Sequence, residues 1–469
     1  MATECKEPSF EFQALGRRKV VAEFNGGTIS SDAGLLLLRE TEARFGIVKG
    51  FAQCFRDHRK QEQIAHTVEE LLLQRIFGIA LGYEDLNDHD LLRSDPLLAV
   101  AAGKDNPNGE DRKRQRDRGK ALAGKSTLNR LELYSESPSR YHRIELKPQE
   151  VDSFFVDTFI KSYPKPPKEI ILDLDATDDP LHGNQEGKFF HGYYREYCYL
   201  PLYIFCGNHL LCARLRESNQ DQSAGTVDEL QRIISQIRRD WSEVKIIIRA
   251  DSGFCRDQIL SWCEANDVHY VIGLARNNRL QGEIKAEMEQ AKELFSASGK
   301  AARVFRDFRY QTLDSWSTER RVVGKAEHLE KGANPRFVVT SLSIDEIEAK
   351  TLYEDLYCQR GEMENRIKEQ QLQLFADRTS THWLKSNQLR LWLSSVAYVL
   401  INELRRVGLA GTEMAQAQCQ TIRLKLFKIG AQIKVSVRRV MVSLASGYPY
   451  RELFEQIYQN LRSFNPLLN

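Results

Sequence analysis

The sequence predicts a mixed α/β core placed between a mostly helical N-terminal region and a helical C-terminal region. Two apolar segments, residues 170–174 and 244–248, are typical of buried strands, and an aspartate follows each of them. A turn at residues 207–208 joins two further apolar segments into a hairpin. Residues 226–241 have apolar side chains at helical spacing, and a second helix and strand follow within residues 256–275. The predicted order is therefore strand, hairpin, helix, strand, helix, strand.

The composition is that of a globular protein with about two or three domains. The chain has 469 residues, of which 42% are hydrophobic and 28% are charged, and its net charge is only +2. Any affinity for nucleic acid must therefore come from how the charges are distributed. The nine cysteines form no C-x-x-C pair, and we see neither a signal peptide nor a run of apolar residues long enough to span a bilayer. We expect a cytoplasmic, nucleoid-associated protein without a membrane segment.

Residues 1–165 are predicted to be mostly helical and to bind DNA. Apolar side chains recur at helical spacing within residues 67–83. Residues 111–125 are rich in Lys and Arg and lead into a short predicted helix. A basic loop before a helix suits a phosphate backbone, although a solvated loop would have the same composition. The candidate DNA-binding residues here are Arg112, Lys113, Arg114, Arg116 and Arg118.

The same basic stretch contains a formal match to a phosphate-binding loop. Gly119 is followed, after four residues, by Gly124, Lys125 and Ser126. Such a loop needs a buried strand just before its first glycine, and the residues there are "RKRQRDR". We therefore expect no nucleotide cofactor.

Acidic residues follow the first predicted strand of the core. Asp173 and Asp175 are two positions apart, so they share one face of that strand, and residues 177–180 end it. A carboxylate at the end of a buried strand needs compensation by a turn cap, a salt bridge or a divalent metal. Asp251 follows the second buried strand in the same way.

A third candidate carboxylate lies in a predicted helix near residue 360. Four side chains are spaced three, four and four residues apart and so form one helical face: Tyr357, Arg360, Glu364 and Lys368. Such a stripe is usually a solvated, salt-bridged face.

Taken together, these segments resemble the DDE transposases of bacterial insertion sequences, which have a ribonuclease-H-like core. The resemblance rests on Asp175-Ala176-Thr177, on "RADSGF" around Asp251, and on "YCQRGEMENRIKE". The last is similar to the family signature Y-x2-R-x3-E-x6-K at Tyr357, Arg360 and Glu364. The signature lysine falls at Gln371, and Lys368 lies one turn earlier.

The resemblance implies a catalytic site and its ligands. Asp175, Asp251 and Glu364 would be the catalytic residues and would bind two Mg²⁺ or Mn²⁺ ions. The site would cut double-stranded DNA at the ends of the element and join it to target DNA, and the DNA complex would contain a homodimer. Tyr357, Arg360 and Lys368 would contact DNA. Possible supporting residues are Asp173, Thr177 and His182.

In the family, a mainly β insertion interrupts the core before the glutamate. Residues 279–342 are predicted to form such an insertion between core segments 166–278 and 343–400. Trp316 lies there among arginines and could hold an extruded base, although packing within a sheet is an equal alternative. Residues 401–469 are predicted to form a basic helical region.

Two other functions remain open from the sequence. The chain could be a domesticated nuclease on the same fold, which would cleave DNA without transposition. It could also be a DNA-binding regulator with an inactive site, although acids in all three blocks argue against this. Short terminal inverted repeats flanking the gene would favour the transposase.

Overall fold

A computed structural model describes residues 8–133 and 139–464 of the chain. Residues 1–7, the start of the segment considered for a signal peptide, lie outside this part, and so does Tyr134 at the end of the short helix predicted after the basic loop. The chain divides into two compact units. The first contains the N-terminal segment up to about residue 145 and the C-terminal segment from residue 396, and the second contains most of residues 146–395. Within the described ranges, we find no helix long and apolar enough to cross a membrane.

The N-terminal part of the first unit is mostly helical, as predicted. The long helix expected over residues 67–83 is α3 (Val68–Leu81), and Thr67 and Glu70 cap its first turn reciprocally. The short helix after the basic loop is α6 (Lys125–Glu132). The other helices of this part are α1 (Leu35–Phe45), α2 (Ile47–Ala52), α4 (His89–Leu92) and α5 (Pro96–Ala101). Its strands are β1 (Phe10–Leu15), β2 (Arg18–Ala22), β3 (Ile29–Ser30), β4 (Phe55–Asp57) and β5 (Ile144–Leu146).

The C-terminal region differs from the helical prediction because it contains a β-hairpin. Strands β18 (Ala431–Ser436) and β19 (Arg439–Leu444) pair with each other, and β18 also pairs with β3. Alternate residues such as Ile433 pack in a core with Ala33, which explains the extended conformation. The helices of this region are α14 (Leu384–Glu403), in which the division between the units falls, α15 (Cys419–Ile422) and α16 (Arg451–Ser463).

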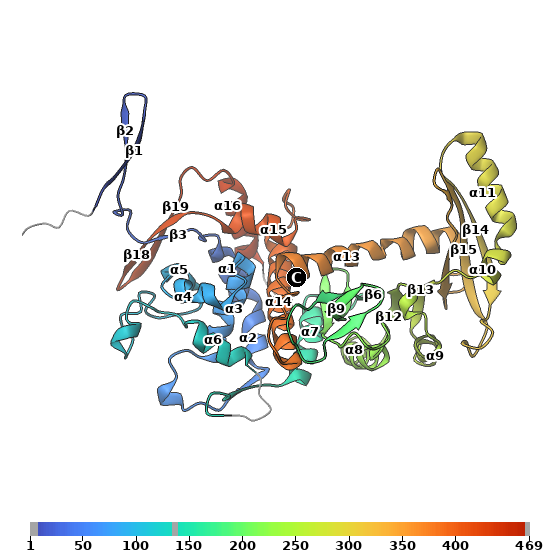
Figure 1. Ribbon diagram of the computed structural model, residues 1–469, viewed down its shortest axis with the longest axis horizontal. Helices are drawn as coiled ribbons and strands as arrows, with labels where there is room; N and C mark the ends of the chain where they lie inside the picture. Colours follow the sequence, from blue (N-terminus) through green and yellow to red (C-terminus); the bar gives the residue numbers. More distant parts are fainter. Residues whose placement is uncertain (1–7, 134–138, 465–469) are drawn as a thin grey trace, which may run out of the picture. The chain divides into compact units, whose positions relative to one another are not determined.

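The second unit is built on one mixed sheet with helices on both faces (Figure 1). Strand β6 (Glu169–Ala176) lies between β10 (Leu202–Cys206), which is antiparallel to it, and β12 (Lys245–Ala250), which is parallel to it. The predicted hairpin is formed by β10 and β11 (His209–Arg214), and β13 (His269–Leu274) continues the parallel part. The mixed α/β core predicted from the sequence is therefore confirmed.

Each face of this sheet has its own helical layer (Figure 1). Leu172 and Leu174 of β6 belong to the core cluster that includes apolar residues of α7 (Pro148–Lys161), α8 (Thr226–Asp240) and α9 (Asp257–Ala265). Ile247 and Val271 on the opposite face pack with Leu352 and Tyr353. The intervening residues of β6, including Asp173 and Asp175, therefore face this second layer.

The second layer is a helical run over residues 349–373. It comprises α12 (Ala349–Thr351), π-helical turns at 352–357 and 369–373, and α13 (Gly361–Lys368), which contains Glu364. This confirms the helix predicted around residue 360.

The strands predicted as an insertion pair with the core sheet and extend it. Strand β17 (Arg336–Thr340) pairs directly with β13, and β15 (Arg320–Leu329) and β14 (Ala302–Tyr310) follow in order. The pairing continues the sheet because β13 would otherwise present an unpaired edge. The remaining elements here are α10 (Asn278–Glu283), α11 (Lys285–Ser298) and β16 (Gly332–Ala333).

Candidate active site

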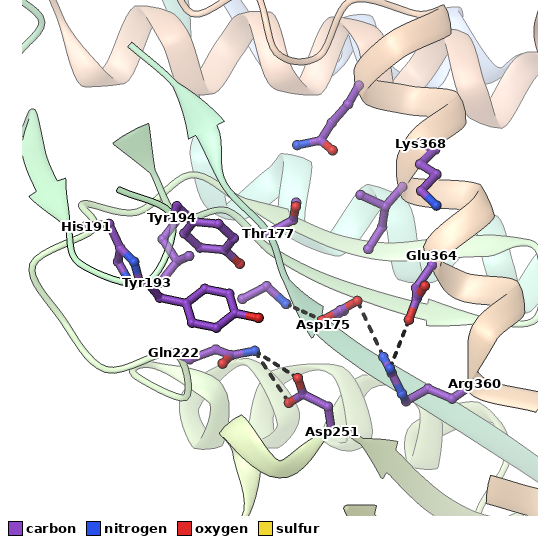
Figure 2. A pocket seen from close by; sticks show the side chains of 14 residues that line it. Asp175, Thr177, His191, Tyr193, Tyr194, Gln222, Asp251, Arg360, Glu364 and Lys368 are labelled. Carbon is purple, nitrogen blue, oxygen red and sulfur yellow. Dashed lines mark hydrogen bonds and ion pairs between the residues drawn. The ribbon is translucent and has the colours of Figure 1, made fainter. Parts of the chain in front are cut away.

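The three carboxylates singled out from the sequence line one cavity of about 510 Å³ in the second unit (Figure 2). Asp175 lies near the end of β6, Asp251 follows β12, and Glu364 lies in α13. The two aspartates come together because β6 and β12 are parallel neighbours, with Ala250 opposite Leu174. Asp251, the residue after β12, is therefore at the level of Asp175 in the neighbouring strand. The cavity lies at the carboxyl ends of these parallel strands, where ligands of open α/β sheets bind.

Asp173 is engaged elsewhere, although it shares the face of Asp175. Its carboxylate accepts two hydrogen bonds from the guanidinium of Arg249, at 2.5 and 2.8 Å. Both side chains are more than 90% buried, and Arg249 also donates to the carbonyl oxygen of Leu356. The carboxylate of Asp173 therefore balances the positive charge of the buried Arg249 guanidinium, between the sheet and the helical run.

Arg360 lies between two of the cavity's carboxylates. Its guanidinium donates to Glu364 at 2.9 Å and is 3.6 Å from Asp175. The dashed lines in Figure 2 show that one side chain on the helical run contacts both acids. Arg360 thus supplies positive charge at the centre of the acidic cluster.

The electrostatic environment raises the pKa of Asp175 to about 7. Burial is the main cause, and the negative charges of Asp251 and Glu364 add to it, whereas Arg360 opposes the increase. The repulsion expected among converging carboxylates is therefore present, and Arg360 relieves only part of it.

Asp251 is held by its own turn and by a neighbouring loop. Its Oδ1 accepts a hydrogen bond from the backbone N–H of Gly253 at 2.8 Å. The Nε2 atom of Gln222 is 3.4 Å from each of its carboxylate oxygens. The hydroxyl of Tyr357 also lies near this turn. A Cβ atom added at Gly273 would lie 2.5 Å from the Tyr357 hydroxyl and 3.1 Å from the backbone nitrogen of Ser252, so both atoms lie beside the same glycine.

The remaining signature positions also lie at the cavity. Lys368 and Gln371 line it from the helical run, and Thr177 lines it from the end of β6. Gln371, at the position of the signature lysine, donates from its side chain to the carbonyl oxygen of Asp178 at 2.9 Å. Gln371 therefore holds the backbone of the segment after β6 in place. Lys368, in contrast, is exposed at the cavity.

Other predicted site residues lie outside the cavity. His182 is exposed in the loop after β7 (Asp179–Pro180). Trp316 is only 6% exposed, and its ring centroid lies 5.9 Å from that of Tyr310 and 5.4 Å from the guanidinium carbon of Arg320. A ring so buried cannot stack on a base while the sheet is intact, so the structure favours the packing alternative.

The basic loop and the phosphate-loop match lie in the first unit. Arg112 and Lys113 donate to the backbone carbonyls of Ala65 and Glu62, while Arg114, Arg116 and Arg118 are exposed. The segment just before Gly119 contains a short 3₁₀ turn at residues 115–117. The ammonium group of Lys125 is bound to Asn87 and Asp90. The strand that a phosphate loop requires is thus replaced by a turn.

Several residues that line the cavity were not predicted from the sequence. His191, at the end of β8 (Phe189–His191), and Tyr193 and Tyr194 in the turn before β9 (Glu196–Tyr199) form the wall opposite the helical run (Figure 2). Gln222 lies beside them. The aromatic cluster in "FFHGYYREY" was the available signal for the first three, whereas Gln222 sits in a polar loop without a motif.

The cavity's side chains fit a hard divalent cation by their chemistry. All three acids offer carboxylate oxygens, the ligands that Mg²⁺ and Mn²⁺ prefer. The pKa of Asp175 is raised mainly by burial, and the negative charges of Asp251 and Glu364 contribute to the increase. As the side chains stand, no three His, Cys, Asp or Glu residues of the described ranges are close enough to surround one ion. Arg360 lies between Asp175 and Glu364, so a cation binding both would displace it.

Comparisons with known proteins identify the family of the chain. No curated protein shows significant sequence similarity to the chain. A solved structure described as the piggyBac transposase synaptic complex with hairpin DNA shares 12% identity and a TM-score of 0.41, and the alignment covers 85% of this chain and 80% of that one. Residues 12–466 match the family described as "Transposase DDE domain group 1". Because this match spans nearly the whole sequence, the chain belongs to the DDE transposase family.

Proposed function

We propose that the protein is the transposase of a bacterial insertion sequence. It binds the ends of its element, cleaves DNA strands there and transfers them to target DNA. The observation that carries the proposal is the convergence of Asp175, Asp251 and Glu364 on one cavity from two adjacent strand ends and the facing helix. The family match supports the same reaction class.

Asp175, Asp251 and Glu364 would hold two divalent cations. Such ions neutralise the phosphate and favour the attacking and leaving oxygens of an in-line displacement. Arg360 and Lys368 lie on the same wall of the cavity and would bind the phosphate oxygens. A water would attack first and free a 3′-hydroxyl, which then attacks target DNA in the same cavity.

The partner implied by this reaction is double-stranded DNA, both as element end and as target. An element has two ends, so a homodimer that contributes one cavity to each end suits the reaction. The chain matches the tyrosine, arginine and glutamate of the Y-R-E-K signature, which supports membership of the branch of DDE transposases that carries this signature. Gln371, at the position of the signature lysine, departs from it.

The direct test is cleavage and strand transfer on a duplex carrying the element's end, with saturating protein and Mg²⁺. Asp175→Asn, Asp251→Asn and Glu364→Gln should each abolish both reactions while leaving DNA binding intact, and a chelator should do the same to the wild type. Glu362→Gln is the matched control, because Glu362 is an exposed acid of the same helix. Cleavage by Glu364→Gln at the wild-type rate would refute the assignment. Cleavage by the wild type without strand transfer would identify a nuclease instead.

A further inference from the structure

Gln222 occupies a special position beside Asp251. It follows β11 and lies in the loop before α8, and its side chain points toward the carboxylate of Asp251 (Figure 2). The Nε2 atom is 3.4 Å from both Oδ1 and Oδ2, so one amide group faces both oxygens. Because Gly253 already donates to Oδ1, Asp251 is held between a backbone N–H group and a side-chain amide.

The space for the Gln222 side chain depends on a glycine. A Cβ atom added at Gly253 would lie 2.1 Å from Oε1 and 2.4 Å from Cδ of Gln222. Gly253 does not have a positive φ, so its backbone does not itself require glycine. The lack of a side chain at Gly253 is therefore what allows the amide of Gln222 to reach Asp251.

The loop that carries Gln222 is anchored on both sides. The buried guanidinium of Arg216 donates to the carbonyl oxygens of Leu200, Gln222 and Ala224, at 2.9, 3.1 and 2.6 Å. Asp221 accepts hydrogen bonds from Ser223 and from Arg256, which follows the turn of Asp251. The backbone of Gln222 is thus tied both to the sheet and to the segment that carries Asp251.

We propose that Gln222 is a positioning residue that orients the Asp251 carboxylate for a divalent cation. The inference rests on the proposed function and deepens it, because it gives Asp251, one of the proposed metal ligands, a side chain that orients it. Hydrogen bonds to a ligating carboxylate fix its direction, and their loss lowers metal affinity. A carboxylate held from two sides loses less freedom when it binds the cation.

The experiment uses Mn²⁺ alone as the probe, with the full chain and no DNA. Mn²⁺ affinity is measured by calorimetry, and thermal stability is measured without metal. Gln222→Ala should weaken Mn²⁺ binding by about 10- to 100-fold, with little change in the metal-free melting temperature and in DNA binding. Gln220→Ala is the matched control, because this exposed glutamine of the same loop donates to the backbone of Glu217 and should leave Mn²⁺ binding unchanged.

Gly253→Ala provides a second, steric test. In the wild-type background it should push Gln222 aside, so that both the melting temperature and the Mn²⁺ affinity fall. In the Gln222→Ala background the added methyl group has room, so the melting temperature should recover and the affinity should fall no further. This non-additivity is expected only if the two side chains compete for one space.

The outcomes separate this inference from the proposed function. Absence of Mn²⁺ binding by the wild type would overturn the proposed function and the inference with it. Normal Mn²⁺ binding by both the wild type and Gln222→Ala would overturn the positioning role alone. Equal destabilisation by Gly253→Ala in both backgrounds would also overturn it, since the methyl group would then clash with something other than Gln222.

Discussion

Asp173 on β6 and Arg249 on β12 form a buried pair directly beside the cavity, joined by hydrogen bonds of 2.5 and 2.8 Å. Asp173→Asn should leave the guanidinium uncompensated and lower the free energy of unfolding by about 3–5 kcal/mol. DNA cleavage below the melting temperature should stay near the wild-type rate, because Asp173 does not line the cavity. Chemical denaturation and end cleavage measure the two effects.

An apolar replacement of the pair provides the control. Asp173→Leu combined with Arg249→Met removes both charges and should restore much of the stability lost by Asp173→Asn. Abolished cleavage by a stably folded double variant would instead place Asp173 in the catalytic site.

The sequence predicted the positions of the acids better than their partners. The alternation of side chains in β6 showed that Asp173 and Asp175 share a face, and the predicted order of strands and helices placed Asp251 after a second buried strand. The pairing of Asp173 with Arg249 depends on the register between β6 and β12, which a single sequence does not define. This register places Arg249 beside Asp173, and so leaves Asp175 as the aspartate that reaches the cavity.

Two features of the strands were not predicted, for a common physical reason. Residues 279–342 were predicted to contain strands, but a single sequence does not identify the strand that each one pairs with, so the pairing of β17 with β13 was not predicted. In the C-terminal region, apolar side chains are spaced two residues apart within each strand, at Ile433 and Val435 and at Val440 and Val442, where helix was predicted. Burial of these side chains produces the hairpin there.

Trp316 should behave as a core residue. Its ring packs against Tyr310 and Arg320, so Trp316→Ala should lower the free energy of unfolding by about 3–5 kcal/mol. DNA binding and end cleavage should fall together and only as far as the folded fraction falls. A variant with normal thermal stability and a selective loss of cleavage would return Trp316 to a DNA-contacting role.

Two buried histidines should make the first unit sensitive to acid. Burial is the main cause that lowers the pKa of both His66 and His89 from 6.5 to about 3. Because the unfolded chain takes up these protons first, stability is complete above pH 6.5 and is lost progressively as the pH falls toward 3. At pH 5 the loss should be about 2 kcal/mol for each histidine.

Urea denaturation followed by circular dichroism at pH 7 and pH 5 measures this loss. His66→Gln and His89→Gln should each reduce the difference between the two pH values, whatever their effect at pH 7. His182→Gln is the control, because that side chain is exposed. An unchanged difference in the double variant would assign the acid sensitivity to other groups.

The basic loop should contribute to DNA affinity through charge alone. Replacing Arg112, Lys113, Arg114, Arg116 and Arg118 with glutamine should make the slope of log K against log salt less steep by up to about 4 units. Lys285→Gln with Lys292→Gln is the control, because these exposed lysines lie on α11 among glutamates. An unchanged slope in the loop variant would exclude the loop from the DNA interface.

Arg360 should have opposite effects on cation binding and on catalysis. Its guanidinium lies 2.9 Å from Glu364 and 3.6 Å from Asp175, where it neutralises the charge that attracts a divalent cation. Arg360→Ala should therefore bind Mn²⁺ more tightly, on the order of tenfold, which corresponds to about 1.4 kcal/mol of lost repulsion. The same variant should cleave end DNA about 100-fold more slowly even at saturating Mn²⁺, because a donor to the phosphate is missing. Calorimetry with Mn²⁺ alone and single-turnover cleavage report the two quantities separately.

Lys350→Ala is the control. It removes an exposed positive side chain from the same helical run and should change neither Mn²⁺ binding nor cleavage. Weaker Mn²⁺ binding by Arg360→Ala would mean that Arg360 orients Glu364 for the cation rather than competing with it.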